Sequence, residues 1–221
     1  MSSRARYEKE LKSVFDNLVL MCRCIETAID KCVKALADRD YDLAREVFDE
    51  DKQIDKMERD IEQSCLKILV MEHPVASDFR EVSAALKMIT DLERIGDQAR
   101  DIAEITTQFG DEGYIKQLAH IPQMAAIVIS MVKDGVQAYI NRDLALARTL
   151  DKTDDKVDGL FNVVMGDLTA LIKKDPDNAE QAIMSMMITK YLERIGDHAV
   201  NIGEWVEYAI TGYHPKKERY P

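Results

Sequence analysis

Apolar residues recur every three or four positions along most of this chain, which is the spacing of a buried stripe on an α-helix. The first such stripe passes through Leu11, Val14, Leu18, Met21, Ile25, Ala28 and Cys32. A spacing that alternates between three and four is typical of the seam of a helix packed in a bundle. The pattern therefore predicts a helix over about 4–37 whose stripe belongs to a core.

The same spacing predicts five more helices, separated by residues that end or start helices. The second helix is expected over about 41–72, and the third from just after His73-Pro74 to about 108. The fourth begins at about 114 or 120 and ends near 141, the fifth ends at Lys173-Lys174, and the sixth covers about 177–211. Asp40 is the expected N-cap of the second helix, and Gly212 is the expected cap after the last. Phe79, Val82, Leu86 and Ile89 are expected on the seam of the third helix, and the same spacing then reaches Glu93 and Gly96.

One hexapeptide, Leu-Glu-Arg-Ile-Gly-Asp, occurs at 92–97 and again at 192–197. A duplicated domain is the simplest cause of such a repeat. The prediction is an all-α, elongated protein of two tandem antiparallel three-helix bundles, with helices about 45 Å long. The bundles are expected at 1–109 and 114–212, joined by the linker Phe109-Gly110-Asp111-Glu112-Gly113 and followed by a short tail at 213–221.

Composition and charge narrow the classes of function. The 221 residues carry a net charge of −11, which argues against a nucleic-acid binder because such a protein needs a basic surface. No apolar run reaches the roughly 18 residues of a membrane span, and the charged N-terminus lacks the core of a signal peptide. We expect a soluble intracellular protein without membrane insertion, whose cysteines are reduced packing residues.

Carboxylates follow one another at helical spacing in both repeats. Glu93 and Asp97 share one helix face with position 101, and Glu193, Asp197 and Asn201 repeat the arrangement. Like charges four residues apart repel each other in a helix. The rows therefore predict that a cation binds there.

A second carboxylate pair borders the stripe of the second helix. Asp51 and Asp55 recur as Asp154 and Asp158 at an offset of 103 residues. Oxygen ligands on two adjacent helices favour hard cations such as magnesium, calcium, manganese or iron(III) over zinc. The alternative is that Arg94 and Arg194 are the cations, paired with the aspartates three residues further on.

The residues also resemble a known family. The doubled hexapeptide, the stretch Pro74-Val75-Ala76-Ser77-Asp78-Phe79-Arg80 and the stretch Asp197-His198-Ala199-Val200-Asn201-Ile202 are similar to the PhoU family of bacterial phosphate-uptake regulators. The resemblance covers nearly the whole chain. It implies two three-helix bundles, often dimeric, that act in the cytoplasm without catalysing a reaction.

The resemblance also implies partners and ligands. PhoU-like proteins are linked to the phosphate-specific ABC transporter, through its ATPase subunit, and to the phosphate-sensing histidine kinase, which they help hold in its non-activating state. Family members bind metal ions, in some cases as multinuclear clusters. The metal positions carried over are Asp51, Asp55, Glu93, Asp97 and Asp101 in the first half, and Asp154, Asp158, Glu193, Asp197 and Asn201 in the second.

Two other classes of function are alternatives to a metal-bearing regulator. A di-iron carboxylate enzyme needs Glu-x-x-His, and none of the four histidines follows a glutamate at that distance. The chain also has no Walker-type phosphate loop and no serine or cysteine nucleophile with a plausible histidine, so no catalytic residue is predicted. The remaining alternative is a metal-independent helical scaffold whose carboxylates are only solvated.

Overall fold

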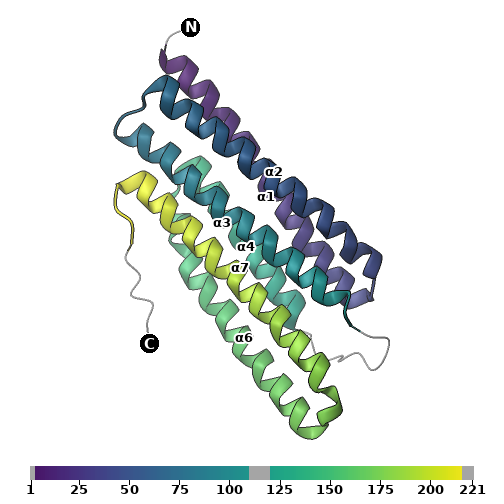
Figure 1. Cartoon of the computed structure of the whole chain (residues 1–221). Helices are drawn as coiled ribbons and strands as arrows, with labels where there is room; N and C mark the ends of the chain where they lie inside the picture. Colours follow the sequence, from purple (N-terminus) through teal and green to yellow (C-terminus); the bar gives the residue numbers. More distant parts are fainter. Residues whose placement is uncertain (1–2, 110–119, 216–221) are drawn as a thin grey trace.

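The structure is a computed structural model that describes residues 3–109 and 120–215. Within these ranges every regular element is helical (Figure 1). The helices are α1 (Ser3–Asp38), α2 (Tyr41–Glu72), α3 (Ser77–Thr106), α4 (His120–Asn141), α5 (Leu144–Ala147), α6 (Thr149–Lys174), the 3₁₀ turn η1 (Pro176–Asn178) and α7 (Ala179–Thr211). The all-helical fold predicted from the spacing of apolar residues is confirmed.

Most predicted helix ends are confirmed by the hydrogen bonds that form them. Asp40 accepts a hydrogen bond from the amide of Leu43 at 2.9 Å, as an N-cap should. Gly212 ends α7 in the left-handed conformation at φ 79°. The helix predicted to close at Lys174 is interrupted at Arg148, which separates α5 from α6. Most of the predicted linker, from Gly110 to Gly113, lies outside the described residues.

The buried stripes assemble into two helical bundles, α1–α3 and α4–α7 (Figure 1). All seven residues of the stripe predicted on α1 are buried. Phe79 is the exception among the α3 predictions, because 48 % of its surface is exposed. It lies in the first turn of the helix, and the buried apolar stripe of α3 begins three residues later at Val82.

The two bundles also pack against each other, which the prediction of two bundles on a linker did not include. α3 lies antiparallel to α7, and α1 contacts α4 (Figure 1). At the second contact the fully buried Tyr139 stacks edge-on against Phe15, with ring centroids 5.4 Å apart, and donates a hydrogen bond to the carbonyl of Glu81 at 2.6 Å. The α3–α7 contact places the two hexapeptides on neighbouring helices.

Two further predictions concern the surface and the thiols. No helix in the described ranges is long and apolar enough to cross a membrane. All four cysteines are free, and Cys22, Cys32 and Cys65 are buried while Cys24 is half-buried. Burial raises the pKa of Cys65 to about 12, so the thiols have the character of packing residues.

Candidate metal-binding clusters

Three of the predicted ligands in the first half converge on one arginine. The guanidinium of Arg100 donates to Asp51 at 3.1 Å, lies 3.0 Å from Asp97 and donates to Asp101 at 3.2 Å. Asp51 comes from α2, and the other three residues come from α3. The structure thus brings these carboxylates together as predicted, but around a side chain that the sequence analysis did not single out.

Burial and charge compete in this first cluster. Burial raises the pKa of the Asp51 carboxyl, and Arg100 opposes that rise. Burial lowers the pKa of Arg100, but the neighbouring aspartates outweigh this effect and leave its pKa raised. The guanidinium is therefore held as a cation, and its N–H groups satisfy carboxylate oxygens that would otherwise be costly to bury.

The outer part of the first cluster is more exposed. Glu93 is half-buried, and burial together with Asp97 raises the pKa of its carboxyl. Asp55 contributes to the rise at both Glu93 and Asp51, so the four carboxylates share one neighbourhood. Arg94 pairs with Asp97 at 3.0 Å, which confirms this predicted ion pair.

The second half arranges the matching carboxylates differently. Asp154 is as buried as its counterpart Asp51, both at 7 % exposure. Its Oδ1 atom lies against Gly196, where a Cβ would come within 2.6 Å of it. The corresponding Gly96 instead faces the side chain of Ile54 at 3.1 Å. Gly196 thus provides a niche for a buried carboxylate, whereas Gly96 provides space for an apolar side chain.

The other carboxylates of the second half lie at different depths. Glu193 is half-buried and accepts a hydrogen bond from Lys190, whose counterpart in the first half is Thr90. Asp158 is exposed, and Asp197 is half-buried. The second row therefore runs from the surface at Asp158 to the niche at Gly196.

Asn201 takes part in the contact between the two bundles. Its Nδ2 donates to Oδ1 of Asp91 at 3.2 Å, and Nδ1 of His198 lies 2.9 Å from the same oxygen. On the other side of the contact, burial raises the pKa of Tyr191, and the neighbouring Asp101 adds to the rise. Asp91 was not predicted, and no spacing in the sequence singles it out, because its partners lie more than 100 residues away.

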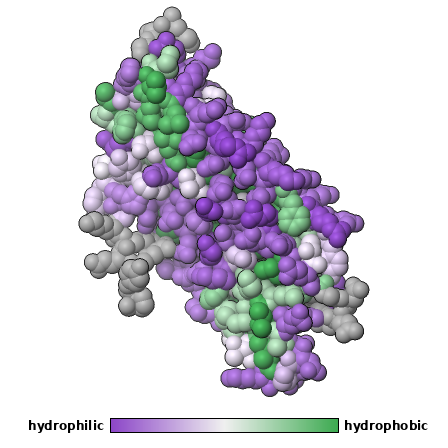
Figure 2. Space-filling view, in the orientation of Figure 1, coloured by the Kyte–Doolittle hydropathy of each residue, from purple (hydrophilic) through white to green (hydrophobic). Residues whose placement is uncertain are grey.

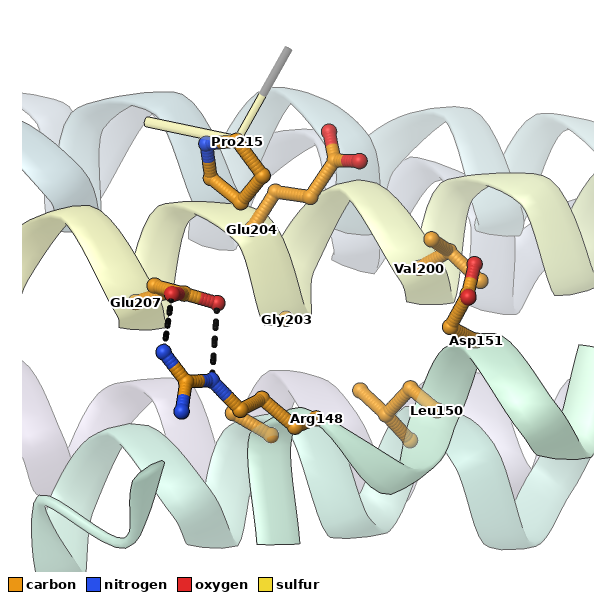
Figure 3. Close-up of a pocket in the computed structure, with 9 residues that line it drawn as sticks. Arg148, Leu150, Asp151, Val200, Gly203, Glu204, Glu207 and Pro215 are labelled. Carbon is orange, nitrogen blue, oxygen red and sulfur yellow. Dashed lines mark hydrogen bonds and ion pairs between the residues drawn. The ribbon is translucent and has the colours of Figure 1, made fainter. Parts of the chain in front are cut away.

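A cavity of about 170 Å³ opens beside the second row, between α6 and α7 (Figure 3). Asp151, Glu204 and Glu207 contribute carboxylates to its lining, and Val200 lies on its wall. Arg148 is held by both oxygens of Glu207, at 2.6 and 3.3 Å. The cavity thus has an acidic lining whose one arginine is already paired.

These arrangements allow a test of whether each cluster fits a metal ion. In residues 3–109 and 120–215, no three histidine, cysteine, aspartate or glutamate side chains stand in a geometry that would hold a metal ion. In the first half the guanidinium of Arg100 occupies the centre of the carboxylates, so that set does not fit a metal. In the second half Val200 stands at the position of Arg100, so these carboxylates have no counterpart of its guanidinium.

The duplicated helices and their acidic rows match a family of known proteins. The profile of the PhoU domain matches this chain twice, over residues 18–106 and 121–206. The chain belongs to the PhoU family. Each match falls within one of the two bundles, so the internal repeat is a repeat of the PhoU domain.

Individual PhoU relatives support the assignment over nearly the full length. The chain is 34 % identical to the phosphate-specific transport system accessory protein PhoU homolog of Clostridium acetobutylicum, covering 95 % of this chain and 96 % of the relative. It is 33 % identical to the homolog of the same name from Pseudomonas aeruginosa, covering 94 % and 86 %.

Solved PhoU structures have the same fold. The crystal structure of PhoU from Pseudomonas aeruginosa superimposes with a TM-score of 0.88 at 33 % identity, covering 94 % of this chain and all of that one. The phosphate transport system regulatory protein PhoU from Streptococcus pneumoniae also gives 0.88, at 24 % identity and with 95 % and 99 % coverage, and supports the fold alone. The predicted fold class is thereby confirmed.

Arg100 is the residue of the first cluster that sequence reasoning missed. A signal for it existed, because the offset of 100 residues aligns Arg100 with Val200. The same alignment sets Asp101 against Asn201, so an adjacent cation and anion in one half replace two uncharged residues in the other. The direction of the Arg100 side chain, toward Asp51 49 residues away, is visible only in the structure.

Proposed function

We propose that this chain is a non-catalytic, cytoplasmic negative regulator of phosphate uptake and of phosphate-starvation signalling. The observation that carries the proposal is the near full-length similarity to relatives named accessory proteins of the phosphate-specific transport system. In this role it couples a phosphate ABC transporter, through the ATPase subunit, to a phosphate-sensing histidine kinase. A coupling protein of this kind acts by binding one conformational state of a partner more tightly than another.

The proposal includes a metal ion on the second bundle. Asp154, Asp158, Glu193, Asp197 and Asn201 would supply oxygen ligands to a hard cation such as manganese, iron, magnesium or calcium. The burial of Asp154 in the niche at Gly196, with Glu193 and Asp197 half-buried on the neighbouring helix, supports this assignment. A bound cation would stabilise the buried Asp154 carboxylate and fix the face of α6 and α7 that a partner contacts.

Apolar surface at the two ends of the molecule supports protein partners and a homodimer. Figure 2 shows this surface near the end where α2 leads into α3 and near the opposite end where α6 leads into α7. At the first end Val70, Met71 and Val75 are exposed, and Val75 is 75 % exposed. At the second end Ile183 and Met187 are exposed. Apolar patches of this kind mark interaction surfaces in proteins without a membrane span.

The test is complementation in a bacterium whose own PhoU protein has been deleted. With phosphate plentiful, expression of this chain should silence a phosphate-starvation reporter, and the ATPase subunit and the kinase should co-purify with it. The paired variant Glu193→Gln with Asp197→Asn should weaken silencing, while Arg45→Ala, a change at an exposed pair with Asp42, serves as the control. An active reporter alongside a folded chain that retains neither partner would refute the proposal.

A further inference from the structure

The outer face of α2 and α3 carries exposed apolar side chains next to a group of carboxylates. Along α2 the order is Glu58, Glu62, Leu66 and Val70, and the last two are 47 % and 66 % exposed. We infer that this α2–α3 face binds a basic amphipathic helix of a protein partner, whose apolar end lies toward the α2–α3 turn. The inference rests on the protein partners of the proposed function and names the surface that one of them contacts.

Helical spacing and register bring these side chains to one surface. Positions 58, 62, 66 and 69 recur every three or four residues, which places them on one side of α2. Positions 79, 83, 86, 90 and 93 do the same on α3. The two helices run antiparallel, in a register set by the bond between Asp51 and Arg100. This register places Leu66 level with Leu86, and Val70 level with Phe79.

The apolar end of the face has few free charges around it. Phe79 is exposed there, and Leu69 and Leu86 are half-buried against the core. Figure 2 shows apolar surface at this end of the molecule, beside a hydrophilic middle. Lys67, next to Leu66 in the sequence, is paired with Glu10 at 3.2 Å. A partner therefore meets apolar side chains at this end, as an amphipathic helix does in an apolar groove.

The carboxylates at the other end of the face repel one another. Burial raises the pKa of Glu58, and Glu62 adds to the rise. Burial also raises the pKa of Glu93, and Glu58 adds to that rise from the neighbouring helix. Arg59 and Arg94 oppose the rise at Glu58 without cancelling it. A cation brought by a partner would relieve this repulsion, so charge complementarity favours a basic segment.

The second half does not repeat this order of side chains. At the offset of 103 residues that aligns the two carboxylate pairs, the four α2 positions are taken by Phe161, Met165, Thr169 and Lys173. The acidic and apolar order is thus particular to the first half. From Glu58 to Val70 the helix rises by about 18 Å, at about 1.5 Å per residue, so a partner helix of about four turns covers the face.

The first test measures binding of a fluorescent peptide to the full-length protein by anisotropy. The probe is a helical peptide of about four turns, with leucines in one half and lysines in the other. Leu66→Ser with Val70→Ser, and Glu58→Gln with Glu62→Gln, should each weaken binding at least about tenfold. Added salt should weaken binding to wild type and to the serine variant more than to the glutamine variant.

Matched controls separate this face from general acidity. Asp16→Asn with Glu46→Gln removes two carboxylates that are 65 % and 61 % exposed on other parts of the first bundle, and should leave peptide binding unchanged. A peptide with glutamates in place of the lysines should not bind. Wild-type binding that survives both face variants, while their circular dichroism spectra show folded helices, would overturn the inference.

The second test uses the partners themselves. In the complementation assay the same two face variants should lose the ATPase subunit or the kinase on purification and should silence the reporter less than wild type does. Full silencing by the folded variants would overturn the inference and leave the proposed regulator standing, whereas failure of wild type to silence would refute the proposed function. A dimer that the serine variant converts to monomer in sedimentation, with peptide binding unchanged, would assign the face to a second copy and also overturn the inference.

Discussion

Asp51 and Asp154 occupy matching positions in the two repeats and are equally buried on equivalent helices, yet their carboxylates lie in different surroundings. Asp51 is bound by a guanidinium from α3, whereas Asp154 sits in a niche that a glycine of α7 leaves open. The change needs only two neighbouring substitutions, Arg100 to Val200 and Asp101 to Asn201, and together they leave the net charge of the cluster the same. Equal charge and equal burial can therefore conceal a difference in what lies against the carboxylate.

The largest expected effect checks that the two halves are otherwise alike. Leu92 and Leu192 open the two hexapeptides and are both fully buried. Leu92→Ala and Leu192→Ala should each lower the free energy of unfolding by about 2–5 kcal/mol, because each leaves a cavity in its core. Urea unfolding followed by circular dichroism measures both. A loss confined to one variant would show that the cores, and not only the cation sites, have diverged.

Removing the guanidinium of Arg100 should have the next largest effect. Arg100→Val leaves the Asp51 carboxyl buried without its guanidinium, and we expect a loss of about 1–3 kcal/mol in metal-free buffer. This is below the usual cost of breaking a buried pair, because the Arg100 side chain is 37 % exposed. The control Arg94→Val removes a more exposed arginine and should cost less than about 1 kcal/mol. Equal losses at the two arginines would refute the conclusion that Arg100 stabilises the buried Asp51 carboxylate.

A smaller effect is expected at the contact between α3 and α7. Asp91 accepts from both His198 and Asn201, so Asp91→Ala leaves two half-buried groups unpaired and should cost about 1–2 kcal/mol. Tyr191→Phe, at the matching position, removes a hydroxyl that lies near Asp101 and should cost less than about 1 kcal/mol. Urea unfolding of both variants tests whether the Asp91 side of the contact contributes more stability than the Tyr191 side. A larger loss from Tyr191→Phe than from Asp91→Ala would contradict this prediction.

The last prediction needs no substitution, because natural thiol and tryptophan probes lie in different halves of the chain. All cysteines lie in the first half, and Trp205, the single tryptophan, lies in the second. Only the half-buried Cys24 should react readily with a thiol reagent at pH 8, because burial raises the pKa of Cys65 to about 12 and shields the other two thiols. Labelling of the buried thiols and Trp205 fluorescence should then report the same urea midpoint. Two separate midpoints would show that the bundles unfold independently.

Much of the fold could be predicted because it depends on local patterns. The bounds of α2, Tyr41–Glu72, and the cap at Asp40 follow from apolar spacing and capping chemistry, which act within a few residues. Phe79 was placed wrongly because periodicity alone does not fix the residue at which the buried stripe of a helix begins. The contact of Asp91 with His198 could not be predicted, because it joins residues 107 positions apart.

The candidate site was predictable in its residue types and not in its occupant. Repetition of the acidic pairs identified both clusters, and spacing of three residues identified the pair of Arg94 with Asp97. Arg100 reaches Asp51 across helices through a long flexible stem, and no spacing rule fixes the direction of such a side chain. Side-by-side comparison of the two repeats is the step that would have drawn attention to it.

The antiparallel contact of α3 with α7 has the form of a symmetric dimer made from one chain. Position 91 meets 201 and position 101 meets 191, which is the reciprocal pattern of an isologous interface. In a true homodimer every substitution appears in both subunits at once. Joining the subunits in one polypeptide removes that constraint, so one copy can carry an arginine where the other carries a valine. The tandem repeat thus allows the two halves of a two-fold architecture to differ in side chains that a homodimer would have to share.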